Sequence, residues 1–161
     1  MDKEPTEEDL VFVTESLGRK PEGLFTVVVR DELDNPRVIR NDPLLPNGRP
    51  MPTLYWLVDP LIRSKIGTLE SRGGVKQAEK ECDSKSVKEA HERYSKERDL
   101  RLPDSYTGPK PSGGVGGTRK GVKCLHAHYA WFLADGKDPV GVWVDEALKK
   151  LNEEQDGSLY E

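Results

Sequence analysis

Residues 24–40 decide the fold, and they read LFTVVVRDELDNPRVIR. Residues 24–30 are rich in β-branched and aromatic side chains, which is the composition of a strand. The turn residues Asp34-Asn35-Pro36 follow. Residues 37–40 can then return as a second strand. The segment therefore predicts a β-hairpin near the N-terminus.

The sequence around the hairpin predicts a helix before it and a third strand after it. Thr6 precedes three acidic residues, and apolar residues then recur at helical spacing until Gly18. Residues 42–52 are interrupted by prolines and cannot form a regular helix or a central strand. Residues 53–58 read as a buried strand, and Pro60 suits the first position of a helix that stops at Gly73-Gly74.

The second half of the chain predicts helices joined by one long loop. Residues 75–100 carry a thin apolar stripe on a strongly charged helix. Residues 103–117 form a loop with three prolines and five glycines, and a helix is expected from about 119 to 135. A final short helix covers residues 143–151, and residues 153–161 read as a flexible acidic tail. The predicted class is α+β, with the N-terminal hairpin and a further strand packed against several helices.

Composition limits the kind of protein this can be. The 161 residues fit one domain, with a globular core of about residues 6–152. A net charge of −4 argues against nucleic acid as a partner. The N-terminus lacks the features of a secretory signal, and no apolar run approaches the roughly 20 residues of a membrane span. Two cysteines do not make a disulfide framework, so a cytoplasmic protein is expected.

Residues 113–128 concentrate the features that could bind a ligand. Gly116 and Gly117 allow backbone N–H groups to approach an anion, and a helix beginning just after them would add free donors. On that helix Arg119, Lys123 and His126 would share one flank at i, i+4 and i+7. These residues, with His128, predict a site for a small phosphate-like anion; the alternative is a flexible loop before a solvated basic face. The segment matches neither a Walker loop nor a dinucleotide fingerprint.

Cys124 and His126 are the candidate catalytic residues. A thiol in the first turns of a helix, beside lysines, is favoured as a thiolate nucleophile, whereas the structural alternative is a small buried filler. The Cys-x-His-x-His spacing also suggests a metal. On a helix, however, Cys124 and His126 point about 160° apart and could not share one ion. Only Cys124 and His128, at i and i+4, could share an ion on a helix, and they would need distant partners such as Cys82, His91 or an acid. Only an extended segment would allow all three ligands, so no metal site is predicted.

Several motifs together resemble a known family. They are Pro50-x-Pro52-Thr53-x-Tyr55-Trp56-Leu57, Leu69-Glu70, Gly116-Gly117-x-Arg119-x-Gly121-Val122-Lys123-Cys124-Leu125-His126-Ala127-His128 and Asp138-Pro139-Val140-Gly141. They resemble the uncharacterised bacterial proteins catalogued as domain of unknown function number five hundred and one. Relatives carry a Cys-Pro in the first hairpin, where this chain has Arg30-Asp31-Glu32. The resemblance implies no activity or cofactor.

Two functions follow as hypotheses from different classes. The leading one is a cytoplasmic ligand-binding protein that holds a small anion at Gly116–His126, and it leaves open whether the protein is an enzyme. The other is a non-enzymatic interaction protein. It would use the charged helix at 75–100 as a partner surface. Some members of the resembled family are encoded near a septum-formation protein and an exopolyphosphatase-like enzyme, so the resemblance implies cell-envelope or phosphate metabolism. The interaction protein would act in cell division or envelope maintenance.

Overall fold

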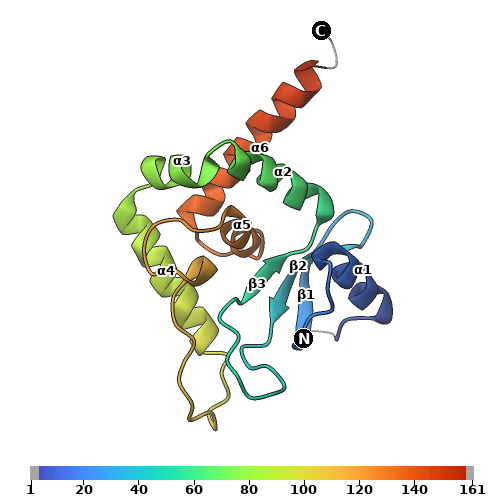
Figure 1. Cartoon of the computed structure of the whole chain (residues 1–161), viewed down its shortest axis with the longest axis vertical. Helices are drawn as coiled ribbons and strands as arrows, with labels where there is room; N and C mark the ends of the chain where they lie inside the picture. The colour runs from blue at the N-terminus through green and yellow to red at the C-terminus, as the bar shows by residue number, and fades with distance from the viewer. Residues whose placement is uncertain (1–3, 159–161) are drawn as a thin grey trace.

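The structure is a computed structural model that describes residues 4–158. It confirms the α+β class, with a three-stranded antiparallel sheet in the order β1-β2-β3 (Figure 1). In chain order the elements are α1 (Glu7–Leu17), β1 (Phe25–Arg30), β2 (Pro36–Asn41), β3 (Tyr55–Leu57), α2 (Pro60–Ser71), α3 (Gly74–Glu81), α4 (Ser84–Asp99), the 3-10 turn η1 (Val115–Gly117), α5 (Leu125–Leu133) and α6 (Pro139–Ser158).

The two faces of the sheet bury two separate cores. Because side chains alternate along a strand, Val38 and Ile39 of β2 point to opposite faces. Val38 belongs to the larger core with α5, whereas Ile39 packs with Val13 of α1 in the smaller one. Figure 1 shows the same arrangement, with α1 on one side of the sheet and α5 on the other. The sheet therefore separates α1 from the helices that carry the candidate site.

Local signals predicted the N-terminal half well. β1 and β2 pair antiparallel, with Phe25 opposite Asn41, which confirms the hairpin. Thr6 caps α1 through the backbone N–H of Asp9, and Asp9 bonds back to the N–H of Thr6, which completes a capping box. Each of these features is specified within a few residues.

Two helices expected from the pattern differ in the structure: one is divided into two, and the other begins later. The predicted helix at 75–100 is broken into α3 and α4, because Cys82 is extended and Asp83 caps α4 through Ser86. The helix expected from residue 119 begins only at Leu125. Gly121 has a φ of +70°, and a Cβ there would collide with the carboxylate of Glu79. The same carboxylate accepts a 2.8 Å bond from the N–H of Val122, so it holds the chain out of helix.

The last helix is longer than the predicted segment 143–151. Pro139 occupies its first position and the carboxylate of Asp138 accepts from the N–H of Val140, so α6 starts early. It continues to Ser158, through part of the segment expected to be a flexible tail. Residues 159–161 lie outside the described range. Among the helices of residues 4–158, none combines the length and hydrophobicity that crossing a membrane requires.

Candidate functional site

The glycine-rich segment forms one wall of a groove rather than the start of a helix. Arg119 and Lys123 lie in irregular chain before α5, so the predicted helical row with His126 is wrong. The first N–H of α5, on Leu125, already donates to the carboxylate of Glu70 at 3.0 Å. An incoming anion would therefore find this helix N-terminus occupied by a protein carboxylate.

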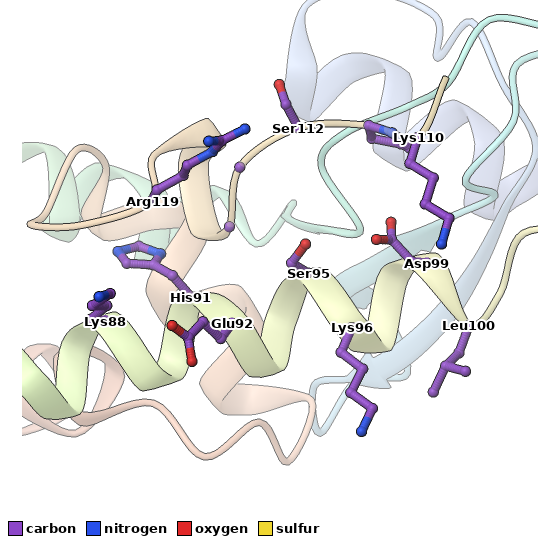
Figure 2. Close-up of a pocket in the computed structure, with 13 residues that line it drawn as sticks. Lys88, His91, Glu92, Ser95, Lys96, Asp99, Leu100, Lys110, Ser112 and Arg119 are labelled. Carbon is purple, nitrogen blue, oxygen red and sulfur yellow. The ribbon is translucent and has the colours of Figure 1, made fainter. Parts of the chain in front are cut away.

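The groove lies between α4 and residues 110–119 and encloses about 640 Å³. Figure 2 shows Lys110, Ser112 and Arg119 on the loop wall across from α4, with the Lys110 side chain extending toward Asp99. Of the predicted ligand-binding residues, only Arg119 lines it. Its lining residues are Lys88, His91, Glu92, Ser95, Lys96, Asp99, Leu100, Lys110, Pro111, Ser112, Gly113, Gly114 and Arg119.

Arg98 fixes the loop wall to α4. Its guanidinium is completely buried, and it donates to the carbonyls of Pro52, Pro111 and Gly113 at 2.8–3.1 Å. It also contacts the carboxylate of Asp99 at 3.2 Å. A buried charge is costly unless it is hydrogen-bonded, so losing these contacts would leave the buried guanidinium of Arg98 uncompensated. The loop is therefore held in one position, and a positive charge lies beneath the groove.

His91 makes a second tie between the walls. Its Nδ1 accepts from the N–H of Val115 at 3.1 Å, and its Nε2 lies 2.7 Å from the carbonyl of Gly121. Burial lowers the pKa of His91, and a neutral ring that donates from Nε2 satisfies both bonds. Gly114 lies so close that a Cβ there would clash with His91. His91 is therefore structural, and the groove keeps its shape around it.

The side chains of the groove carry more positive than negative charge. Four are basic (Lys88, Lys96, Lys110 and Arg119), and two are acidic (Glu92 and Asp99). Asp99 is already paired with Arg98. Within residues 4–158, the four basic side chains make no ion pair or hydrogen bond. Their charges are therefore available to a ligand.

A second group of side chains meets at the start of α5. One potential ligand atom from each of Glu70, Cys124 and His126 lies within 4.8 Å of the other two. The earlier argument that Cys124 and His126 point apart is wrong, because Cys124 precedes the helix and is extended, with φ −144° and ψ 115°. Glu70 reaches the group from the end of α2.

The imidazole of His126 is held on both sides. Its Nδ1 lies 3.2 Å from Oε1 of Glu70, and its Nε2 lies 3.1 Å from the carbonyl of Arg63. Burial alone would lower the pKa of His126, but bonds to Cys124 and to the Arg63 carbonyl and the charge of Glu70 raise it overall. The side chains of His126 and Glu70 are 28% and 27% exposed, so solvent reaches this cluster.

Two other predicted site residues, Gly116 and His128, lie outside the groove. Gly116 lies beside the cluster, since a Cβ added to it would be 3.6 Å from Cβ of Cys124 and 3.8 Å from Cβ of Lys123. His128 is completely buried, with Nδ1 2.6 Å from Oδ2 of Asp138. It is thus part of the core and cannot meet a ligand together with Arg119.

Sequence reasoning missed Glu70 and the lysines of α4 and the loop. In the sequence, Glu70 belongs only to the Leu69-Glu70 motif of the resembled family. That motif was the one signal that could have marked Glu70, since it lies 54 residues before Cys124 in the chain. The lysines at 88, 96 and 110 had no signal, because charged residues on a helix or loop are usually only solvated.

The fold and the two sites define a mixed α+β protein with a basic groove and a Cys–His–Glu cluster. The chain belongs to the family described as Protein of unknown function (DUF501), whose family model matches residues 27–146. The match includes both walls of the groove and all three residues of the cluster. No curated protein and no solved structure matches the chain.

Proposed function

We propose that the protein binds a small linear polyanion, such as a short chain of phosphoryl groups, in the groove between α4 and residues 110–119. The observation that carries this proposal is the set of four basic side chains without partners along that groove. Arg119 can grip a phosphate through two parallel N–H groups, and the lysines add point charges.

The spacing of the charges favours a chain over a single phosphate. Lys88 and Lys96 are eight residues apart on α4, which at 1.5 Å per residue is about 12 Å. In Figure 2, Lys110 and Arg119 extend from the loop wall, while Lys96 leaves α4 on the side away from that wall in this view. A single phosphate can contact only one end of such a row. A ligand with several linked charges can contact more of it.

The surrounding charge favours a small ligand. The whole chain has a net charge of −4, whereas the groove side chains count four positive and two negative charges. A large polyanion such as nucleic acid would meet the negative remainder of the protein. A short phosphate chain would meet only the groove. The anion in this proposal is held by side chains rather than by the helix N-terminus expected from the sequence.

Calorimetric titration with phosphate, pyrophosphate and tripolyphosphate tests this function. We expect affinity to rise with chain length. Arg119→Ala should weaken tripolyphosphate binding at least tenfold, as removal of a hydrogen bond to a charged group does. Binding should also weaken as salt increases, since exposed charges are screened. Equal affinity for all three ligands, or no heat at millimolar concentration, would rule the groove out.

Catalysis by Cys124 and His126 stays a prediction, since neither residue lines the groove. The role as a non-enzymatic interaction protein, with the charged face of α3 and α4 as its surface, also stays a prediction. No observation on these helices points to a protein partner, whereas the unpaired cations of the groove support an anionic ligand.

A further inference from the structure

We propose that Glu70, Cys124 and His126 bind one thiophilic divalent metal ion of the zinc class. This site is separate from the anion groove and does not depend on it. The three residues offer one oxygen, one sulfur and one nitrogen, the donor atoms that zinc takes in proteins. In the structure these atoms lie within 4.8 Å of one another. Bond lengths of about 2.0–2.3 Å place tetrahedral ligands about 3.3–3.8 Å apart, so small side-chain rotations would close the site.

The contacts around the cluster are those that orient metal ligands. The carbonyl of Arg63 lies 3.1 Å from Nε2 of His126 and can accept a hydrogen bond from the N–H of that nitrogen, which leaves the lone pair of Nδ1 for the ion. The N–H of Leu125 binds Oε2 of Glu70 at 3.0 Å, which leaves Oε1. Both free atoms face each other at 3.2 Å. Glu70 and His126 are thus each held by a backbone group on the far side from the other.

The chain also presents the three ligands on fixed elements. Glu70 is in the last turn of α2, and His126 is in the first turn of α5. Cys124 is the residue just before α5, and its backbone is extended, which leaves its thiol within 4.8 Å of the ligand atoms of Glu70 and His126. Gly116 packs over Cys124 with a φ of +68° and carries no side chain that would cover the thiol. Three protein ligands leave a fourth position for water or a substrate.

The donor set selects the ion. A thiolate is a poor ligand for magnesium and calcium, which prefer several oxygen atoms. Zinc and cobalt(II) accept sulfur, nitrogen and oxygen in one tetrahedral site. The simpler reading of the cluster is a Glu70–His126 ion pair beside a thiol. The two readings differ in whether Cys124 acts as a ligand.

Cobalt(II) titration of metal-free protein distinguishes them. We expect one equivalent to bind and to give the thiolate-to-cobalt absorption band together with intense tetrahedral bands. Zinc should displace the cobalt, and magnesium and calcium should not. Zinc affinity, measured by competition with a chromophoric chelator, should fall about a hundredfold or more in Cys124→Ser and in His126→Gln, since each loses one of three ligands.

Cys82→Ser is the matched control, because Cys82 lies elsewhere and contacts the carbonyl of Pro139. It should bind zinc as the wild type does. Thermal melting of each variant checks that Cys124→Ser and His126→Gln remain folded. If either proves unfolded, loss of the thiolate band on adding one equivalent of zinc to cobalt-loaded wild type still supports the site. A cobalt spectrum without the thiolate band overturns the proposal, as does zinc binding that Cys124→Ser leaves unchanged.

Discussion

Replacing Arg98 with Met should cost the protein more stability than any surface substitution. Methionine keeps much of the length of the stem but removes the guanidinium. The carbonyls of Pro52, Pro111 and Gly113 then lose bonds of 2.8–3.1 Å. Ser95 also loses its 3.0 Å contact. The substitution therefore removes a whole set of bonds around one buried charge.

The size of the effect follows from these contacts. A buried polar group left without its partner costs about 1–3 kcal/mol. Three such groups set an upper limit of about 9 kcal/mol. The loop carbonyls lie at the groove and regain some water, so we expect a loss of about 3–5 kcal/mol, the usual range for breaking a buried charged contact.

Urea denaturation followed by tryptophan fluorescence measures this loss, since Trp131 packs edge-on against Tyr94 with ring centroids 5.2 Å apart. Arg72→Met is the control, because Arg72 is 59% exposed and, within residues 4–158, its side chain pairs only with the exposed Glu154. It should change stability by less than about 0.5 kcal/mol. If the free energy of unfolding of Arg98→Met is within about 1 kcal/mol of that of the wild type, Arg98 does not anchor the loop and the reasoning is refuted.

Three further predictions concern other parts of the fold. The guanidinium of Arg30 lowers the pKa of Asp9 to about 2, below the value of about 3.9 in an unfolded chain. The Arg30–Asp9 pair therefore stabilises the protein above about pH 4, and this contribution is lost as the pH falls from 4 to 2. Arg30→Gln should therefore lower the free energy of unfolding by about 1 kcal/mol at pH 7, a modest amount because Arg30 is partly exposed. At pH 2 it should cost almost nothing. Urea denaturation at the two pH values measures this, and an equal cost at both pH values would contradict it. Tyr94→Phe should lose about 1–3 kcal/mol in the same assay, because the Tyr94 hydroxyl accepts from two backbone N–H groups at the start of β3, at 2.6 and 3.3 Å; no loss would mean that water replaces it. Burial raises the pKa of the Cys82 thiol, so in a Cys124→Ser variant iodoacetamide should label Cys82 about tenfold more slowly than a free thiol at pH 7, and labelling as fast as a free thiol would show that Cys82 is accessible.

The sequence predicted the parts of the fold that depend on near neighbours. The hairpin, the capping of α1 and the start of α2 at Pro60 are all encoded within a few residues. The start of α5 was placed about six residues too early. Its position depends on the carboxylate of Glu79, which lies about 40 residues away and holds the backbone at Val122. No local periodicity reports such a contact.

The candidate site shows the same limit. Residues 113–128 were predicted to be the place where chemistry could occur, and both the groove and the Cys–His–Glu cluster include part of this segment. The side chains that complete the cluster and the groove come from elsewhere in the chain. Glu70 on α2 completes the cluster, and Lys88 on α4 faces the loop across the groove. The sequence prediction also placed Cys124 and His126 on opposite sides of one helix. The helix in fact begins only at Leu125, so Cys124 lies outside it and the helical angle between the two residues does not apply.

The central claim is that a phosphate chain binds between α4 and the loop wall, and paired double variants test it most directly. Lys110→Ala/Arg119→Ala removes two charges from the groove, and Lys120→Ala/Lys123→Ala removes two exposed charges from the same segment outside it. Both lower the net charge equally. Calorimetric titration with tripolyphosphate should show that the first variant loses binding and the second retains nearly wild-type affinity. Equal loss in the two variants, or loss only in the second, would contradict the groove as the binding site.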